Sequence, residues 1–300
     1  PISEGVYTFI VQATDSCSAI SRDTIAVTID FNSPPTANAG VDQSIFQCTP
    51  ALISWAASCA DVDGNLSSCN LISGTGAYNG TNISFTPVAS GSYTFIIEAT
   101  DACGATKRDT AIINVTINSA PTCNMPPDTS SFFQCAPTQV SLAVGATDPD
   151  GNFDHCEIIN GPGSLVGGNW VYTPSGDEFR KVVIRCLDQC GAYCLDSFFV
   201  KFDINTPPTA NAGADQNIFQ CAPTLISWAA SCADVDANLT SCVLVSGTGS
   251  YNGTNISFTP AASGSYTFIL EATDACGAKG RDTAFINVTI KTPPTANAGA

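Results

Sequence analysis

Apolar and polar residues alternate with a period of two along many short stretches of this 300-residue chain. The stretch SYTFIIEA, for example, places Tyr93, Phe95, Ile97 and Ala99 on one face. Turn-forming residues, mainly Gly, Pro, Asn and Asp, separate such stretches at intervals of about 8 to 12 residues. No stretch shows the 3.6-residue period of an amphipathic helix. The pattern therefore predicts an all-β protein made of short strands.

The same strand pattern recurs along the chain. The triplet FQC ends at Cys48, Cys135 and Cys221, so its copies are 87 and 86 residues apart. The pattern D-x-C ends at Cys103, Cys190 and Cys276 with the same steps, and an earlier copy ends at Cys17. We therefore expect the C-terminal part of one domain (1–32), three complete domains (33–118, 119–205 and 206–291) and the start of the next repeat (292–300).

A repeat of about 86 residues with this many strands fits a seven-stranded immunoglobulin-like sandwich. The expected fold is thus a set of tandem immunoglobulin-like β-sandwiches in a linear array. The segments PPTANAGVDQ, DVDGN and SYTFIIEATDACGATKRDTAIINVTI resemble bacterial PKD-type and cadherin-like repeats. The middle repeat, with APTC and CGAYCLDSFFVKF, is also similar to a hyalin repeat. The DFGDG signature of PKD domains and the full cadherin calcium motifs are missing.

Each repeat carries four recurring oxygen-bearing side chains, on one loop and on one later turn. In an Ig-like sandwich both lie at the same end, where we also expect Asn38 and Asp42 of the incoming linker. Alternate oxygen ligands suit a hard cation such as Ca²⁺, which would stiffen the joint as the resemblance to cadherins implies. The alternative is that they close Asx-turns. The candidate calcium ligands are Asp61, Asp63, Asn65 and Asp101, then Asp148, Asp150, Asn152 and Asp188, then Asp234, Asp236, Asn238 and Asp274.

Comparing the copies indicates which of the 15 cysteines pair within a repeat. Strand parity places Cys59 and Cys69 inward at one end, which predicts Cys59–Cys69 and, by repetition, Cys232–Cys242. In the middle repeat Ala146 replaces the first of these, and Cys186 appears inward beside Cys156, which predicts Cys156–Cys186. Two more cysteines appear there together on the first and last strands, as in hyalin repeats, which predicts Cys123–Cys194.

The cysteines that recur in every complete repeat cannot pair within it on this topology. The Cys48 type lies at the bottom of the sandwich and the Cys103 type at the top, about 25 Å away along a strand of roughly eight residues. A disulfide needs Cα atoms about 6 Å apart. Because the bottom of one domain meets the top of the next, we predict interdomain bridges Cys48–Cys190 and Cys135–Cys276. A bridge inside each domain, on a different strand path, is the alternative.

Composition narrows the class of function. The net charge of -16 argues against binding to nucleic acid or to an anionic membrane. The cysteine content indicates an oxidising, extracellular or cell-surface location, and no apolar run is long enough to span a membrane. A single His, His155, leaves no repeated catalytic triad and makes a zinc site improbable, so we expect no enzyme.

The weakly charged surface, with 12% charged residues, suggests either a covering or association with further copies into fibres. Glycans would provide a covering, and acceptor sequons recur at asparagines that include Asn79, Asn82, Asn114, Asn252, Asn255 and Asn287. The sequence therefore favours a structural segment of an extracellular filament or cell-surface stalk. Two alternatives are spacer repeats of a large adhesin and an accessory module of a secreted polysaccharide-degrading enzyme.

Overall fold

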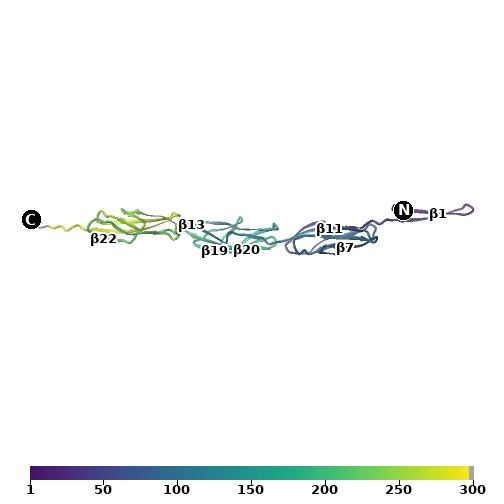
Figure 1. The fold of residues 1–300 in the computed structure, drawn as a ribbon, viewed down its shortest axis with the longest axis horizontal. Coiled ribbons are helices and arrows are strands. Elements are labelled where there is room, and N and C mark those ends of the chain that lie inside the picture. Colours follow the sequence, from purple (N-terminus) through teal and green to yellow (C-terminus); the bar gives the residue numbers. More distant parts are fainter. Residues whose placement is uncertain (297–300) are drawn as a thin grey trace. The chain divides into compact units, whose positions relative to one another are not determined.

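The structure is a computed structural model that describes residues 1–296, and residues 297–300 of the expected next repeat lie outside the described part. Residues 1–296 consist of strands and connecting segments and contain no helix, so no helix there could cross a membrane (Figure 1). The prediction of an all-β fold built from tandem immunoglobulin-like sandwiches is confirmed.

Contacts between residues divide the chain into two compact units. The first comprises residues 1–122, 147–154 and 187–193, and the second comprises 123–146, 155–186 and the chain from residue 194 onward. The boundary passes through the middle repeat, whose two loops at one end belong with the first unit.

The chain begins with a hairpin of β1 (Gly5–Thr14) and β2 (Ile20–Ile29), which pair with each other in the antiparallel sense. The first complete repeat follows. Its larger sheet has the order β4-β11-β10-β7 and its smaller sheet the order β5-β9-β8, while β3 and β6 form a two-stranded ribbon. Its strands are β3 (Thr36–Asn38), β4 (Gln43–Gln47), β5 (Ile53–Ala56), β6 (Ser58–Ala60), β7 (Leu66–Ser73), β8 (Ala77–Tyr78), β9 (Asn82–Phe85), β10 (Gly91–Asp101) and β11 (Thr106–Ile117).

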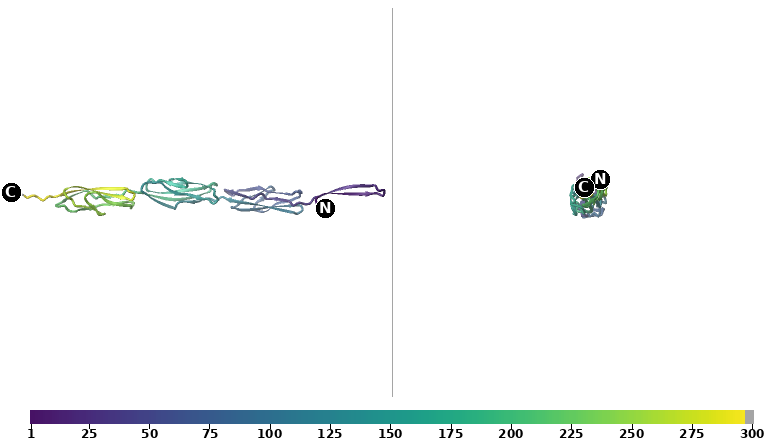
Figure 2. Two further views of the ribbon diagram at one scale, coloured as in Figure 1. Left: turned by 90° about the horizontal axis from the view of Figure 1, so that it is seen from above. Right: turned by 90° about the vertical axis from the view of Figure 1, so that its left-hand side faces the viewer.

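The middle and third repeats reproduce these sheets, in the orders β13-β20-β19-β16 with β14-β18-β17, and β22-β29-β28-β25 with β23-β27-β26. Figure 2 shows the same ribbon from two further directions. The middle strands are β12 (Thr122–Asn124), β13 (Thr129–Gln134), β14 (Val140–Ala143), β15 (Gly145–Thr147), β16 (Phe153–Asn160), β17 (Ser164–Val166), β18 (Asn169–Tyr172), β19 (Glu178–Asp188) and β20 (Tyr193–Ile204). The third repeat has β21 (Thr209–Asn211), β22 (Gln216–Gln220), β23 (Ile226–Ala229), β24 (Ser231–Ala233), β25 (Leu239–Ser246), β26 (Ser250–Tyr251), β27 (Asn255–Phe258), β28 (Gly264–Asp274) and β29 (Lys279–Ile290).

A tryptophan lies at the centre of each core. In the first repeat Trp55 of β5 packs edge-on against Phe95, with ring centroids 5.0 Å apart, and its Nε1 donates to the Ala39 carbonyl at 2.7 Å. Gly40 lies against this ring: a Cβ there would be 2.7 Å from Trp55 Cδ1, and its φ of +91° also favours glycine. The close approach of this backbone to the ring fixes the linker against the core.

The middle repeat places its tryptophan on the opposite strand of the same pair. Trp55 of β5 faces Ile83 of β9, whereas Leu142 of β14 faces Trp170 of β18. Trp170 is fully buried and its Nε1 donates to the Pro162 carbonyl at 2.8 Å. The large and the small side chain have exchanged strands, which keeps the core volume nearly constant.

Candidate functional site at the joints between repeats

The predicted aspartate loop forms a tight turn in all three repeats. Asp148 follows β15 by one residue, and its Oδ1 accepts a hydrogen bond from the Asp150 amide at 2.9 Å. The equivalent bonds to Asp61 and Asp234 both measure 2.8 Å. These are Asx-turns, in which a side-chain carboxylate closes the loop on its own backbone. One of the two interpretations drawn from the sequence, the Asx-turn, is therefore present.

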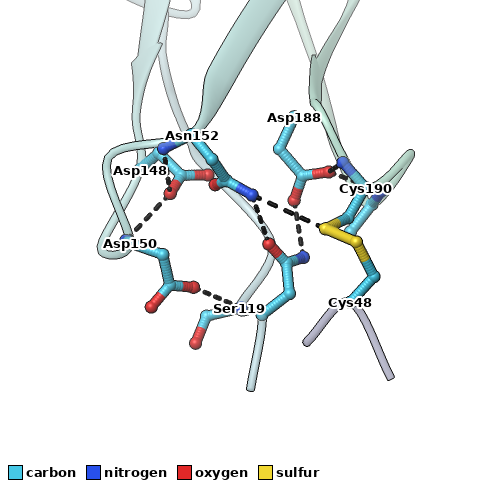
Figure 3. The surroundings of a disulfide bond; sticks show 9 residues. Cys48, Ser119, Asp148, Asp150, Asn152, Asp188 and Cys190 are labelled. Carbon is cyan, nitrogen blue, oxygen red and sulfur yellow. Dashed lines mark hydrogen bonds between the residues drawn. A yellow bond between two sulfur atoms is a disulfide. The ribbon is translucent and has the colours of Figure 1, made fainter. Parts of the chain in front are cut away.

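The turn between the last two strands is built around a buried aspartate. In the middle repeat this residue is Asp188, which is 3% exposed at the end of β19. Its Oδ1 accepts hydrogen bonds from the amides of Cys190 and Ala192, both at 2.9 Å (Figure 3). Its Oδ2 accepts a third from Asn118 Nδ2 at 2.8 Å. Because Asn118 belongs to the linker, the carboxylate ties the linker to the turn.

The aspartate loop makes two further hydrogen bonds to the linker. Asn118 Oδ1 accepts from Asn152 Nδ2 at 2.6 Å, and the Ser119 amide donates to Asp150 Oδ2 at 2.5 Å. The amide of Asn118 itself donates to the Gln47 carbonyl of β4 at 2.9 Å. The Asn118 side chain thus donates a hydrogen bond to Asp188 through Nδ2 and accepts one from Asn152 through Oδ1. Such a relay aligns the linker in one orientation.

The same relay is present at the other two described joints. The first uses Asn32 Nδ2 to Asp101 Oδ2 (2.8 Å), Asn65 Nδ2 to Asn32 Oδ1 (2.7 Å) and the Ser33 amide to Asp63 Oδ2 (2.6 Å). The third uses Asn205 Nδ2 to Asp274 Oδ2 (2.7 Å), Asn238 Nδ2 to Asn205 Oδ1 (2.6 Å) and the Thr206 amide to Asp236 Oδ2 (2.6 Å). Nine of the twelve candidate ligands therefore bond the linker, and the other three, Asp61, Asp148 and Asp234, close the turn of the loop beside it.

The linker residues that complete the relay were not singled out from the sequence. Asn38 and Asp42, which we expected at this end, lie elsewhere: Asn38 accepts from the Gly40 amide, and Asp42 accepts from the Ile112 amide. That expectation is wrong, because the linker makes its contacts before β3 begins. A signal was available in the recurring pair Asn-Ser or Asn-Thr at 32, 118 and 205, which repeats with the 86- and 87-residue step.

The hydrogen bonds account for the acidity of the buried carboxyls. The Asn32 side chain and the backbone amides of the turn hold the pKa of Asp101 below its ordinary value of 3.8, against the opposing effect of burial. Burial acts to raise the pKa of Asp274, but Asn205 and the amides of its turn outweigh it and the pKa is lowered. Both groups are therefore carboxylates at neutral pH and strong hydrogen-bond acceptors.

In this structure the carboxylates of the joints are engaged in hydrogen bonds. Ca²⁺ requires six to eight oxygen ligands converging on one point. Here N–H groups point at the carboxylates, and within residues 1–296 no three Asp, Glu, His or Cys ligand atoms from these loops gather within 4.8 Å. The group that does so consists of Cys123, Cys186 and Cys194, whose sulfurs are all in disulfides.

A disulfide crosses each of two joints beside the relay. Cys48, directly after β4, is bonded to Cys190 in the turn after β19, with Cα atoms 5.3 Å apart (Figure 3). Cys135 is bonded to Cys276 with the same Cα separation. Asn152 Nδ2 also lies 3.7 Å from Cys190 Sγ, so the relay and the bridge are in contact.

The remaining predicted pairs are also brought together among the described residues. Cα separations are 5.9 Å for Cys59–Cys69, 6.0 Å for Cys232–Cys242, 5.7 Å for Cys123–Cys194 and 3.9 Å for Cys156–Cys186. The exposed thiols of Cys17, Cys103 and Cys221 are not in disulfides in the described chain.

Comparison with known proteins places the fold but no family model matches the chain. A Rattus norvegicus protein described as a homolog of dyslexia-associated protein KIAA0319 is 27% identical over 329 residues, covering 96% of this chain and 29% of its own length. This chain thus spans less than a third of that relative. The rat protein does not support the bacterial part of the predicted resemblance.

Solved structures of tandem cadherin domains share the fold. The cis-dimer structure of protocadherin gammaB7 EC3-6 has a TM-score of 0.58 at 16% identity, covering 95% of this chain and 85% of its own. Protocadherin gamma B2 domains 3–6 give 0.53 at 14%, covering 96% and 84%. Mouse cadherin-23 EC22-24 gives 0.50 at 15%, covering 87% and 100%. The likeness shows tandem cadherin-like sandwiches.

Proposed function

We propose that this chain is a force-bearing structural segment of an extracellular filament or cell-surface stalk. The observation that carries the proposal is the disulfide across a joint, seen at Cys48–Cys190 and at Cys135–Cys276. Each connects one repeat to the next at a second point besides the chain itself. Each joint then has two covalent connections, and it cannot separate by unfolding alone.

The hydrogen-bonded relay supports the same function by fixing the linker. A joint with an unrestrained linker would act as a hinge, because several hydrogen bonds are needed to offset the backbone entropy lost when the linker is ordered. Asn118 supplies three such bonds, through its amide, its Nδ2 and its Oδ1, to three separate segments. The relay uses hydrogen bonds where a calcium-dependent joint uses an ion. The proposed joint therefore works at any calcium concentration.

An extracellular location is part of the proposal, because disulfides persist in oxidising compartments. Twelve of the 15 cysteines are in disulfides in the described chain, which fits secretion. A non-catalytic role accords with the carboxylates of the joints, which are engaged as acceptors in structural hydrogen bonds.

Electron microscopy of native surface material labelled with an antibody against this chain tests the proposal. A filament or stalk predicts label at regular intervals along a thin fibre, unchanged after EGTA treatment. Label confined to a globular tip would favour the adhesin alternative, and label found in a soluble secreted fraction would contradict both. As a comparison, the same material is sheared with and without a disulfide reductant. The reductant should fragment or lengthen the fibres only if their strength depends on the disulfides between repeats.

A further inference from the structure

One of the two outermost strands of the larger sheet differs in chemistry among the three repeats. These edge strands are β7, β16 and β25, at the edge opposite β4, β13 and β22. An edge strand presents unpaired N–H and C=O groups, which pair with other chains unless charge, proline or a covering segment prevents it. How each repeat protects its edge is therefore a functional question for a chain of low surface charge.

Two of the three edges carry no charge. β7 has the sequence LSSCNLIS and β25 the sequence LTSCVLVS, with neither a charged residue nor a proline. Ile72, Val243 and Val245 on these strands are 43–46% exposed. β16, with the sequence FDHCEIIN, carries Asp154 and Glu157. At this edge of the larger sheet, charged residues are therefore present on the strand of the middle repeat and absent from the strands of the other two.

Glycosylation sequons follow the opposite distribution. The short strand beside each uncharged edge, β8 or β26, is followed at once by Asn79-Gly-Thr or Asn252-Gly-Thr. The middle repeat has Val166-Gly-Gly at this position and lacks any sequon. Repeats without charge on the edge strand thus have sequons beside it, and the repeat with charge has none.

The geometry of Asn79 is suited to modification. Its Oδ1 accepts hydrogen bonds from the Thr81 amide at 3.0 Å and from the Thr81 hydroxyl at 3.1 Å. The side chain is exposed, and its Nδ2 makes none of the hydrogen bonds of the described chain. Asn252 and Thr254 repeat this arrangement at 3.1 and 3.2 Å.

The sequons at Asn82 and Asn255 are less accessible, and the exposed Asn287 has its amide nitrogen engaged. Asn82 is half-buried in β9, and its Nδ2 donates to the Thr81 hydroxyl at 3.0 Å. Asn255 does the same with Thr254 at 3.0 Å, and Asn287 Nδ2 donates to Asn217 at 3.0 Å. The amide nitrogen that a sugar would bond is engaged at these three positions.

We propose that Asn79 and Asn252 are N-glycosylated and that their glycans shield the uncharged edge strands. An open groove of about 430 Å³ lies beside β7, and Asn70, Ile72, Tyr78 and Gly80 are among its lining residues. Asn79 stands between the last two of these, so a glycan attached there starts at the rim of the groove. The glycan occupies the space through which another strand would approach.

The modification requires a lipid-linked oligosaccharide diphosphate as co-substrate. Asn79 Nδ2 forms a bond to the sugar C1, the bond from C1 to the diphosphate oxygen breaks, and the lipid diphosphate leaves with the bonding electrons. Nδ2 loses one proton, and no oxidant or reductant is consumed. The hydrogen bond from the Thr81 hydroxyl to Oδ1 holds the carboxamide in position for this step.

Glycopeptide mass spectrometry of the full chain, secreted from a host with an oligosaccharyltransferase, tests the modification. The expected result is sugar on Asn79 and Asn252, with lower occupancy at Asn82, Asn255 and Asn287. Bare Asn79 and Asn252 in a chain glycosylated elsewhere, or a chain bare throughout, would overturn the proposal.

The shielding role has a separate test. Thr81→Ala with Thr254→Ala removes both sequons, whereas Ser84→Ala with Ser257→Ala removes only the sequons of Asn82 and Asn255 and serves as the matched control. Sedimentation velocity should show concentration-dependent association for the first variant, at concentrations at least tenfold below any seen for the control. Hydrogen exchange should then slow in β7 and β25.

Folding and shielding can be told apart in the same material. Trimming the glycans of the folded wild-type chain with an endoglycosidase that leaves one sugar should also promote association, without any substitution. If neither the variant nor the trimmed chain associates more than the control, the edges are not shielded by glycans. Unchanged circular dichroism in all samples excludes unfolding as the cause.

Discussion

Three of the six disulfides should limit how far this chain can be stretched. A taut chain follows the shortest covalent path between its ends. From Cys48 that path crosses to Cys190, then from Cys194 to Cys123, and finally from Cys135 to Cys276. The segments that remain under load are residues 1–48, 190–194, 123–135 and 276–300.

These segments contain about 87 peptide steps, against 299 for the whole chain. At about 3.4 Å per residue, the oxidised chain reaches about 300 Å, whereas the reduced chain reaches about 1,000 Å. Replacing Cys48 and Cys190 by Ser removes the first shortcut, so the shortest path then crosses Cys59–Cys69 and has about 148 steps, or about 500 Å. The three states differ by far more than the error of a contour-length measurement.

Single-molecule force spectroscopy with handles at the two ends measures these lengths directly. The matched control is Cys59→Ser with Cys69→Ser, whose bridge lies off the shortest path and should leave the limit at about 300 Å. An oxidised wild-type chain that extends well past about 300 Å, or a Cys48/Cys190 variant that does not lengthen, would refute the bridge pattern and the force-bearing role.

Three further predictions concern the loops and the relay. Ala237→Gly should stabilise the third repeat by about 0.5–1 kcal/mol in denaturant unfolding, because the φ of 57° at Ala237 costs a non-glycine residue about 1–2 kcal/mol, whereas the greater entropy of glycine in the unfolded chain lowers stability by only about 0.4–1 kcal/mol. Gly64→Ala should destabilise the first repeat for the same reason, and a destabilised Ala237→Gly variant would count against this account. Thermal stability measured by calorimetry should be level between about pH 5 and 7 and should decrease below about pH 4, because the pKa values of Asp101 and Asp274 are lower in the folded state, which therefore binds fewer protons than the unfolded state. Asn32→Leu and Asn205→Leu should weaken this pH dependence, and an unchanged slope would show that the relay does not set it. The melting temperature should be the same in EGTA and in millimolar CaCl₂, since a joint that bound calcium would be stabilised by mass action, and a rise of several degrees with calcium would contradict the hydrogen-bonded relay.

The sequence determined the fold class because strand patterning is local. The alternation in SYTFIIEA appears in β10, where Phe95, Ile97 and Ala99 are fully buried. Comparing the repeats also indicated the cysteine pairs. The middle repeat has Ala146 at the position of Cys59 and gains Cys186 at another position, so the loss of one cysteine together with the gain of another points to the partner of Cys156. Strand length then favoured a partner for Cys48 outside its own repeat, and the structure has that bridge, to Cys190.

The chemistry at the joints was decided only by tertiary structure. The sequence shows that Asp101 recurs, but it does not show whether its oxygens meet a cation or an N–H group. That depends on Asn32, which lies 69 positions earlier in the chain and reaches Asp101 only when the linker is in place. A hydrogen bond needs its two atoms within about 3 Å in the right direction. The period of apolar residues along the sequence indicates which side chains of a strand are buried. The partner of a buried carboxylate depends instead on how separate segments of the chain meet in space.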